Sequence, residues 1–518
     1  MVATGFERAK PVAIQNTAAQ GGWLNVLTLG MGKEMNGKVN MYRVFCDRVA
    51  LQPDHPAIIG PGESQHLTYG ELKERIDNIA QRLRAHGIAE GQCVGLHYQS
   101  GVDYIVMTYA IWACGACTVP IAMELTPDEK YRVIKDIRVE TIITAAQSEG
   151  LFSSQTRGEI ISINADSRLI PIRPEREHPS GFLAVNAAFL RFTSGTTSTS
   201  KGVVLSHETI FDRIHAANDV LNIGPNDSVV WLLSMSYHFT VSIVAYLSFG
   251  ASIVLCPNYF GKTIVMAANR NGATLIYGSP THFRMMAHEN SGLSMTQLRL
   301  AISTTTALTN EIEQAFFKRF GIPLTQAYGI IEIGLPFICT ENQTEKPNSV
   351  GKLLPEFEVQ LVDIGEDRGV GRIQVRGKGM LDAYYDPWKT RESILMEDGW
   401  FDTGDLGYFD EDGYLFIVGR SKEMISVAGM KFFPQEVEKV LESHPDVKEA
   451  CVFAVPQAQT GEVGRARVVL RNGSVDERAI PDLMAHCATQ LAAYKIPEQI
   501  LLVNELPRTA SGKLIRRL

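Results

Sequence analysis

The sequence has little cysteine, no excess of positive charge and no long hydrophobic run. Its eight cysteines, among 518 residues, show no regular spacing, which excludes a disulfide framework and predicts reduced thiols. Lys and Arg total 49 against 57 Asp and Glu, a net charge of −8, so a dedicated nucleic-acid or anionic-membrane binder is disfavoured. The longest apolar stretch, residues 241–256, is broken by serines and a glycine. It predicts a buried helix and a strand, and no membrane span.

The sequence also lacks a secretory segment and a cysteine pattern typical of a metal or redox site. The first residues include no apolar segment of the secretory type, so we expect a cytoplasmic protein. Cys114 and Cys117 form a close cysteine pair, but neither a second pair nor nearby histidines accompany it. Two small buried residues are therefore favoured over a redox or zinc pair.

Predicted helices and strands alternate along the first two thirds of the chain. Thr68 and Glu71 form a capping box that opens a helix, and apolar residues follow at helical spacing up to Leu83. Short apolar strands recur, for example at residues 93–97 and 141–144. This alternation predicts parallel sheets with helices on both faces.

The last third of the chain has a different pattern. Short strands rich in Val and Ile, between residues 357 and 418, are separated by turns rich in glycine and aspartate, which indicates a smaller β-rich unit. From Ser421 onward, predicted helices near residues 434–441 and 479–491 alternate with strands. This segment is predicted to form an α+β domain of about 100 residues.

A loop rich in hydroxyl groups gives the strongest local signal. A strand-like run at residues 187–192 is followed by TSGTTSTSKG, residues 193–202. Hydroxyl and backbone N–H groups donate hydrogen bonds to phosphate oxygens, and Lys201 adds a compact positive charge. The loop lacks the Gly-Lys-Ser/Thr ending of a P-loop. A flexible Ser/Thr linker is the alternative interpretation.

Four further motifs lie in the second half of the chain. Residues 328–332, YGIIE, combine an aromatic plane, a tight turn and a carboxylate of the kind that holds Mg²⁺. Residues 400–405, WFDTGD, place a carboxylate on a glycine turn, where its oxygens can accept hydrogen bonds from a ribose diol. Residues 418–420, VGR, add a guanidinium, and residues 507–513, PRTASGK, end on a lysine. Each motif alone is more often structural.

Taken in this order, the five motifs resemble those of the adenylate-forming superfamily of acyl-CoA synthetases, luciferases and peptide-synthetase adenylation domains. The resemblance extends from about residue 40 to the end. It implies an α/β fold with a large N-terminal AMP-binding domain, residues 1–419, of two α/β subdomains plus a β-barrel-like subdomain. A small, mobile α+β C-terminal lid domain, residues 420–518, would follow.

The resemblance also implies a reaction in two steps. A carboxylate attacks the α-phosphate of ATP, giving an acyl-adenylate and pyrophosphate, and the thiol of CoA or of a carrier-protein phosphopantetheine then takes the acyl group. Because two anions must approach each other, catalysis is mostly positioning and electrostatic stabilisation. The implied partners are ATP, Mg²⁺, a small carboxylic acid, and CoA or an acyl or peptidyl carrier protein.

Roles in the first step carry over by matching position. Glu332 would hold Mg²⁺, and Asp405 would bind both ribose hydroxyls with Arg420 beside it. Lys513 would bridge the α-phosphate and the carboxylate in this step only. The residues expected around ATP are Thr193, Ser194, Gly195, Thr196, Thr197, Lys201, Thr304, Thr305, Tyr328, Gly329, Asp405 and Arg420.

Four other residues match positions near the acyl group or the thiol. His238 would lie beside the acyl group, although a core histidine is the alternative. Lys422 matches the hinge about which the C-terminal domain swings. Gly429 would leave room for a pantetheine arm. Lys431 either contacts the CoA phosphates or is a solvated surface lysine.

The sequence departs from the family pattern in places. Ser198 and Ser200 replace a glycine and a proline of the phosphate loop, and Ile331 replaces the threonine before the Mg²⁺ carboxylate. Threonines at residues 304–306 replace glycines of the adenine-site loop, where the acyl pocket often extends. We therefore expect a shorter or more polar pocket than in long-chain fatty-acid enzymes.

Residues 234–237 bear on the type of carboxylic acid that the protein activates. Amino-acid-activating relatives place an aspartate near Met235 to hold the α-ammonium group, but residues 234–237 carry no charge. An acyl or aryl acid is thus favoured over an α-amino acid, because an unpaired buried ammonium is costly. Three alternatives remain open: activation of an amino acid, transfer of the adenylate to a non-thiol acceptor, and a degenerate non-catalytic nucleotide-binding module.

Overall fold

The computed structural model describes residues 37–62, 65–192, 201–306, 308–363, 369–508 and 514–516. The described residues group into two compact units. The larger unit comprises residues 37–358 and 376–401, and the smaller unit comprises residues 359–375 and 402–516. The predicted domain boundary at residues 419 and 420 stays a prediction.

The larger unit contains two nine-stranded mixed sheets. In the first sheet, the five strand pairs from β1 through β11, β10, β12 and β13 to β14 are parallel, and antiparallel strands flank them. The order of this sheet is β16 (Lys352–Leu353), β15 (Gly334–Ile338), β14 (Leu324–Ile330), β13 (Leu300–Ser303), β12 (Leu275–Gly278), β10 (Ser228–Trp231), β11 (Ser252–Leu255), β1 (Pro56–Ile59) and β2 (Leu67–Thr68).

The second sheet has a parallel centre of β5, β3, β4 and β8. Antiparallel strands lie on both sides of that centre. Its order is β20 (Lys389–Thr390), β19 (Ala383–Tyr384), β9 (Gly202–Ser206), β8 (Ala187–Phe192), β4 (Cys117–Pro120), β3 (Cys93–His97), β5 (Val139–Ala145), β7 (Ser167–Pro171) and β6 (Ile161–Ser162).

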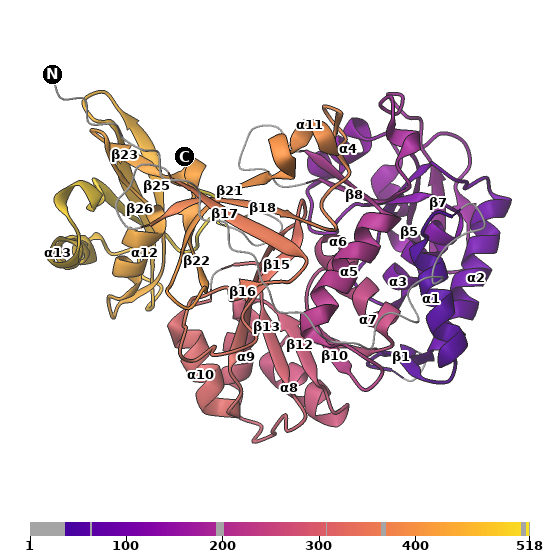
Figure 1. Ribbon diagram of the computed structural model, residues 1–518, viewed down its shortest axis with the longest axis horizontal. Coiled ribbons are helices and arrows are strands. Elements are labelled where there is room, and N and C mark those ends of the chain that lie inside the picture. The colour runs from indigo at the N-terminus through magenta and orange to yellow at the C-terminus, as the bar shows by residue number, and fades with distance from the viewer. Residues whose placement is uncertain are drawn as a thin grey trace. The chain divides into compact units, whose positions relative to one another are not determined.

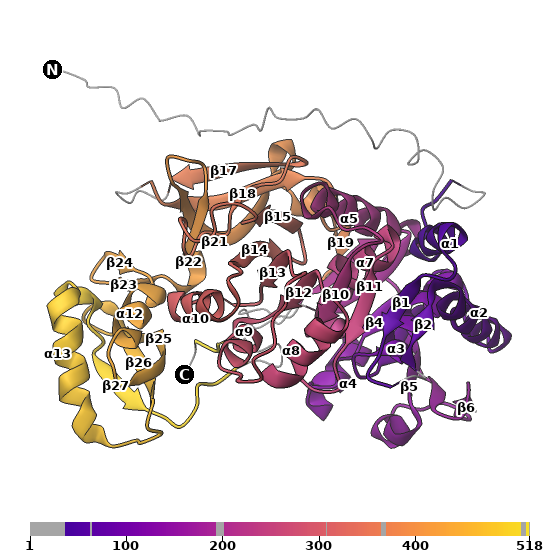
Figure 2. The same ribbon diagram turned by 90° about the horizontal axis from the view of Figure 1, so that it is seen from below.

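Helices pack against both sheets of the larger unit, with α2 beside α3 and α9 between α8 and α10 (Figures 1 and 2). The capping box of Thr68 and Glu71 starts α2 as predicted, and its apolar face is buried through Leu83. The α-helices are α1 (Met41–Leu51), α2 (Tyr69–Ala85), α3 (Val102–Ala113), α4 (Pro127–Asp136), α5 (His207–Leu221), α6 (Met235–His238), α7 (Ile243–Phe249), α8 (Gly261–Arg270), α9 (Pro280–Ala287), α10 (Asn310–Phe320) and α11 (Arg391–Ile394). Short 3₁₀ helices are η2 (Ala146–Phe152), η3 (Phe182–Ala184), η4 (Phe239–Val241) and η5 (Glu397–Gly399).

The smaller unit has a four-stranded and a five-stranded sheet. Helix α12 packs on β25 and against α13 (Figures 1 and 2). The first sheet is ordered β17 (Phe357–Asp363), β18 (Gly371–Gly377), β21 (Phe401–Phe409) and β22 (Leu415–Arg420), of which residues 357–358, 376–377 and 401 are assigned to the larger unit. The second contains β24 (Met430–Phe432), β23 (Ile425–Val427), β26 (Gly461–Leu470) and β25 (Val447–Gln457), with β27 (Gln499–Leu502) paired to β26. The helices are η6 (Ser421–Glu423), α12 (Pro434–Glu442), η7 (Glu477–Ala479), α13 (Ile480–Gln490) and η8 (Ala493–Lys495).

These elements confirm the predicted α/β class and the change of pattern toward the C-terminus. The apolar stretch at residues 241–256 forms α7 and β11, which are largely buried. None of the helices in the described part of the chain has the length and hydrophobicity that crossing a bilayer requires. All eight cysteines are free thiols, and Cys114 and Cys117 are buried as predicted.

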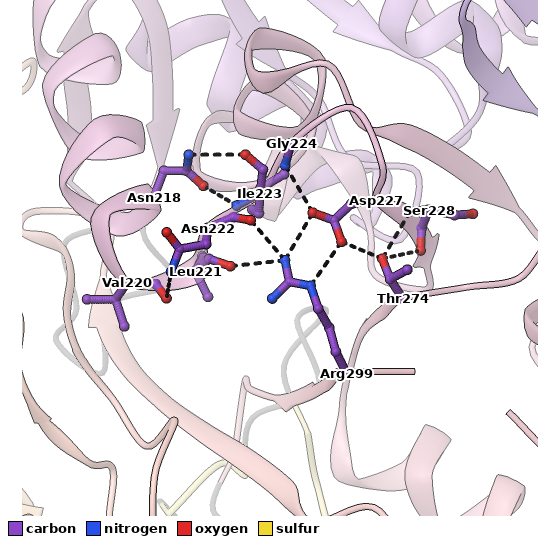
Figure 3. Close-up of polar contacts among 10 residues, drawn as sticks. All are labelled: Asn218, Val220, Leu221, Asn222, Ile223, Gly224, Asp227, Ser228, Thr274 and Arg299. Carbon is purple, nitrogen blue, oxygen red and sulfur yellow. Dashed lines mark hydrogen bonds and ion pairs between the residues drawn. The ribbon is translucent and has the colours of Figure 1, made fainter. Parts of the chain in front are cut away.

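A buried carboxylate ties together the starts of three strands of the first sheet (Figure 3). Asp227 accepts hydrogen bonds from Nε of Arg299 at 3.0 Å, from Oγ1 of Thr274 at 2.6 Å and from the backbone N–H of Gly224 at 2.9 Å. Arg299 also donates to the carbonyl of Leu221 at the end of α5, at 3.0 Å. Burial alone would raise the pKa of Asp227, but these hydrogen bonds lower it below its ordinary value.

We predict that Arg299→Met lowers the free energy of unfolding by about 1–3 kcal/mol, because it leaves a buried carboxylate with fewer donors. The contribution of Asp227 is present above the unfolded carboxyl pKa and is lost as the pH falls through the lower folded value. Urea unfolding at pH 7 and at pH 3 measures both effects. Arg270→Met, at the exposed end of α8, serves as the control. Equal stability of the two variants at pH 7 would contradict the prediction.

Candidate active site

The hydroxyl-rich loop joins two paired strands of the larger unit. Thr193, Ser194, Gly195, Thr196 and Thr197 lie outside the described residues, as do Ser198 and Ser200. Strands β8 and β9 flank the loop and form an antiparallel pair, with Phe192 opposite Gly202. Phe192 and Gly202, the residues on either side of 193–201, are therefore held opposite each other, and the strand predicted at residues 187–192 is confirmed as β8.

Lys201 is the first described residue after this loop. It is exposed, and its Nζ lies 4.4 Å from the centroid of the Tyr384 ring. Tyr384 is on β19, which pairs with β9 so that Tyr384 lies opposite Val203. The ring face attracts the ammonium group and restricts where it can lie. Tyr384 has no counterpart in the sequence prediction, because it lies far along the chain from Lys201.

The same tyrosine reaches the predicted Mg²⁺ carboxylate. The hydroxyl of Tyr384 donates to Oε1 of Glu332 at 3.4 Å, a long hydrogen bond. Burial, together with the charge of Glu332, raises the pKa of the Tyr384 hydroxyl, so it keeps its proton and acts as a donor. Tyr384 thus contacts both Lys201 and Glu332, which the sequence predicted as members of one site.

Two arginines, the buried Arg213 and the half-buried Arg191, lie near Glu332. Arg191, on β8, donates a hydrogen bond to the carbonyl of Tyr237, and burial lowers its pKa while the charge of Glu332 opposes that shift. Arg213, on α5, donates to the carbonyl of Ile331 at 3.2 Å. Burial lowers the pKa of Arg213 to about 10, so it stays protonated at neutral pH. Arg191 interrupts the apolar run of β8 in the sequence, a signal that the prediction did not use.

Tyr328 and Gly329 lie on β14 just before Glu332. The ring of Tyr328 is half-buried, with its centroid 6.2 Å from that of Phe337 on β15. A Cβ on Gly329 would lie 2.1 Å from the carbonyl oxygen of Gly334, so no other residue fits without moving the backbone. The register of β14 and β15 shifts at this point, between Tyr328 and Ile330. This irregularity re-aims the side chains that follow it.

The predicted adenine-site loop follows β13. The backbone N–H of Thr304 donates to the carbonyl of Gly278 at 3.0 Å. Thr305 has a φ of +80°, a left-handed conformation that is strained for a β-branched residue. Glycine adopts this conformation without strain, so the departure from the family pattern puts backbone strain next to the candidate site.

His238 ends α6 within a group of aromatic side chains. Its ring centroid lies 6.0 Å from that of Tyr277 and 6.3 Å from that of Trp231. Trp231 and Tyr277 stack at 5.5 Å, at the carboxyl ends of the neighbouring parallel strands β10 and β12. Burial raises the pKa of Tyr277 to about 12 against the effect of a hydrogen bond with Thr304. Thr304 and His238 therefore belong to one cluster, at the edge where open α/β sheets bind ligands.

In the smaller unit, Asp405 and Arg420 lie opposite each other on β21 and β22. Oδ1 of Asp405 is 3.1 Å from Nε of Arg420, and the Asp405 residue is only 5 % exposed. The backbone N–H of Asp405 donates to Oγ1 of Thr403 at 3.1 Å. The pair that the sequence predicted is thus formed.

The predicted hinge and tunnel residues follow this pair directly. Lys422 is exposed within η6, and Lys431 is exposed on β24. Gly429 and Ala428 form the two-residue turn between β23 and β24, with φ of +84° and +51°. A Cβ on Gly429 would meet nothing within 4 Å, so its backbone conformation is the local reason for glycine. The tunnel role of Gly429 stays a prediction, and Lys513 lies outside the described residues.

A divalent ion could bind at this site through the Glu332 carboxylate together with substrate phosphates. Among the described side chains, no three His, Cys, Asp or Glu residues gather in a possible metal cluster. Mg²⁺ is commonly bound through one or two carboxylates together with substrate phosphates. Glu332 supplies such a carboxylate, and a Mg²⁺ ion there would take its other ligands from ATP and water.

Comparison with known proteins identifies relatives that match most of the chain. Residues 45–385 match the model of the AMP-binding enzyme family, and residues 436–513 match that of the AMP-binding enzyme C-terminal domain. The chain is 30 % identical to a probable CoA ligase, CCL9, of Humulus lupulus, covering 90 % of this chain and 93 % of that protein. It is also 30 % identical to a 2-succinylbenzoate–CoA ligase of Bacillus cereus, covering 91 % and 96 %.

A solved structure has the same fold. The o-succinylbenzoate CoA synthetase of Bacillus subtilis, in complex with its acyl-adenylate intermediate, is 26 % identical, with a TM-score of 0.78 over 91 % of this chain and 96 % of that one.

Proposed function

The chain belongs to the AMP-binding enzyme family, and from this premise we propose that it is an ATP-dependent acid–thiol ligase. It joins a carboxylic acid to ATP as an acyl-adenylate with release of pyrophosphate, and then transfers the acyl group to a thiol. The observation that carries the proposal is the contact of Tyr384 with both Lys201 and Glu332, which are a loop cation and a carboxylate of two family motifs. One named relative is a probable CoA ligase and the other is a 2-succinylbenzoate–CoA ligase.

The larger unit would manage the charges of the triphosphate. Lys201 supplies a positive charge at the end of the loop, and Tyr384 restricts its position. When bound at Glu332, Mg²⁺ would neutralise phosphate charge. Arg213 holds the carbonyl of Ile331, and so it orients the backbone next to Glu332 where the family's threonine is absent.

The smaller unit would supply the ribose contact and the mobile cation. The oxygens of Asp405 are suited to accept hydrogen bonds from both ribose hydroxyls, and the ion pair with Arg420 orients that carboxylate. Lys513 would lie between the α-phosphate and the attacking carboxylate. Rotation about Lys422 would then bring Gly429 and Lys431 toward the thiol. Acyl-CoA is the product that the named relatives favour, with a carrier-protein phosphopantetheine as the other acceptor.

The acid is proposed to be a medium-chain or aryl acid without an α-ammonium group. Thr304, His238 and the stacked Trp231 and Tyr277 line the end of the sheet where the acyl group is expected. We expect the threonines at residues 304–306 and the aromatic rings to leave less room than a long alkyl chain needs. One of the two named relatives acts on 2-succinylbenzoate, an aryl acid.

This pocket predicts a ranking of substrates. A C6–C8 or aryl acid is expected to drive ATP–pyrophosphate exchange at least about tenfold faster, by kcat/KM, than a C16 acid. A pocket too short for the C16 chain is expected to weaken transition-state binding of that acid by about 1–3 kcal/mol. The measurement is exchange of labelled pyrophosphate into ATP over a panel of acids of graded length, with α-amino acids included. Faster exchange with the C16 acid would overturn the pocket assignment, and exchange only with an α-amino acid would overturn the acid class.

The acceptor is identified by the second half-reaction. The best acid of the panel is incubated with ATP and Mg²⁺, and CoA, a phosphopantetheinylated carrier protein, an amine or an alcohol is added separately. The proposal expects a thioester with CoA or the carrier. An amide or ester alone would assign a non-thiol acceptor, and absence of exchange with every acid would favour a non-catalytic nucleotide-binding module.

A cytoplasmic location is proposed on the evidence of the eight free thiols.

A further inference from the structure

Arg191 is a charged side chain on an otherwise apolar strand. Strand β8 reads AAFLRF, and Arg191 is its one charged residue. A guanidinium carries five N–H donors and keeps its charge in proteins. Within the described part of the chain, Arg191 donates one hydrogen bond, from Nη1 to the carbonyl of Tyr237, and its Nε is buried without a partner. A half-buried cation with so few partners is suited to a ligand of opposite charge.

Arg213, in the same unit, shows the contrast with an arginine whose donors are used by the fold. Its Nε donates to the carbonyl of Gly379 at 3.0 Å and its Nη2 to the same oxygen at 2.5 Å. Its Nη1 donates to the carbonyl of Ile331 at 3.2 Å, and the residue is 3 % exposed. All three nitrogens of Arg213 therefore have partners, whereas among the described residues only Nη1 of Arg191 has one.

Arg191 projects from the same face of the second sheet as Tyr384. Both residues lie opposite Val203 on β9, Arg191 from β8 and Tyr384 from β19. Residues directly opposite each other on antiparallel strands share a face of the sheet. The hydroxyl of Tyr384 donates to Glu332 at 3.4 Å, and the charge of Glu332 also acts on Arg191. Arg191 thus lies on the face of the sheet that meets the predicted Mg²⁺ carboxylate.

Arg191 also contacts the segment that carries the aromatic cluster. Its Cζ lies 5.7 Å from the centroid of the Tyr237 ring, and the carbonyl of the same tyrosine accepts its hydrogen bond. Tyr237 precedes His238 on α6, and the His238 ring centroid is 6.0 Å from that of Tyr277. Arg191 therefore neighbours both the cluster where the acyl group is expected and the carboxylate where Mg²⁺ is expected.

We propose that Arg191 binds the reacting carboxylate of the acid substrate, through N–H groups that the fold leaves unused. The proposal rests on the proposed function, in which this carboxylate lies between the acyl group and the α-phosphate. A carboxylate that leaves water there needs a compensating cation, and a guanidinium can donate two parallel hydrogen bonds to it. In the acyl-adenylate the same group is an uncharged ester-like carbonyl, so the arginine contributes less to transfer.

The test compares Arg191→Met and Arg191→Lys with Arg168→Met in pyrophosphate exchange. Arg168 is on β7 of the same sheet, with its Nε 3.1 Å from Oε2 of Glu149. Arg191→Met is expected to raise KM for octanoate or benzoate by about 10- to 100-fold, and KM for ATP by less than about twofold. Arg191→Lys recovers part of the affinity for the acid, because it keeps the charge but not the paired donors. Arg168→Met changes neither KM.

A matched pair of acids identifies which carboxylate the arginine binds. Octanoate and octanedioate have the same length and differ by a second carboxylate at the far end of the chain. Arg191→Met is expected to weaken both acids by a similar factor, because both have the reacting carboxylate. A loss confined to octanedioate would assign Arg191 to a second acidic group of the substrate and overturn the proposal.

Transfer of a supplied acyl-adenylate to the thiol separates binding of the carboxylate from a general structural role. In Arg191→Met this transfer is expected to stay within about twofold of the unmodified protein. Equal losses in transfer, in affinity for ATP and in affinity for the acid would overturn the proposal, as would an unchanged KM for the acid. If Arg191→Met does not fold, Arg191→Lys decides: KM for the acid rises severalfold with KM for ATP unchanged, or the proposal is wrong. If the unmodified protein shows no exchange with any acid, it is the proposed function that fails, and this proposal with it.

Discussion

Lys513→Ala is expected to slow formation of the acyl-adenylate by about 10³-fold, while transfer of a supplied acyl-adenylate to the thiol stays within about twofold. The reason is electrostatic. The attacking carboxylate and the α-phosphate are both anions, and a cation between them lowers the energy of their approach and of the transition state. Thiol attack on the acyl-adenylate has no such pair of anions, so it does not need the lysine.

The two half-reactions are measured separately. Pyrophosphate exchange reports adenylate formation, and thioester formation from synthetic acyl-adenylate reports transfer. Lys448→Ala is the matched control, since Lys448 is a surface lysine in the same unit, 4.0 Å from Glu449. A similar loss in both half-reactions would contradict the assignment of Lys513 to the first step alone.

Asp405→Asn is expected to raise KM for ATP roughly 50-fold, because hydrogen bonds from the ribose hydroxyls to a charged acceptor are worth about 1.5–3 kcal/mol each. The carboxylate is nearly fully buried and paired with Arg420 at 3.1 Å, so its orientation is well defined before any nucleotide binds. An amide keeps one acceptor oxygen and loses the charge. The KM for the acid is expected to change little.

Deoxynucleotides isolate the ribose contact. The unmodified protein is expected to discriminate against 2′-deoxy-ATP by roughly tenfold in kcat/KM, and Asp405→Asn by less than about twofold. Asp402→Asn is the control, because Asp402 pairs with Arg372 at 3.0 Å in the same sheet. If Asp405→Asn discriminates against the deoxynucleotide as strongly as the unmodified protein, Asp405 does not bind that hydroxyl.

Local features of the fold were predictable from the sequence because they depend on neighbouring residues. The capping box at Thr68 and the strand before the hydroxyl-rich loop are local patterns, and both are confirmed. Asp405 and Arg420 were predicted together from two motifs, and the pairing of β21 with β22 confirms their contact.

Contacts between distant segments could not be read from the sequence. Tyr384 reaches Lys201 because β19 pairs with β9, and nothing in either strand specifies the other as its partner. The left-handed backbone at Thr305 was not predicted, since threonine rarely adopts it.

In the proposed reaction, the carboxylate of the acid attacks the α-phosphate of ATP. The most direct measurement uses an acid with ¹⁸O in both carboxylate oxygens, incubated with the protein, ATP, Mg²⁺ and the thiol acceptor. After transfer, mass spectrometry of the nucleotide is expected to show AMP carrying one ¹⁸O atom from the acid, because the carboxylate oxygen that attacked stays on phosphorus. Unlabelled AMP, or label in inorganic phosphate with ADP as the nucleotide product, would contradict the account.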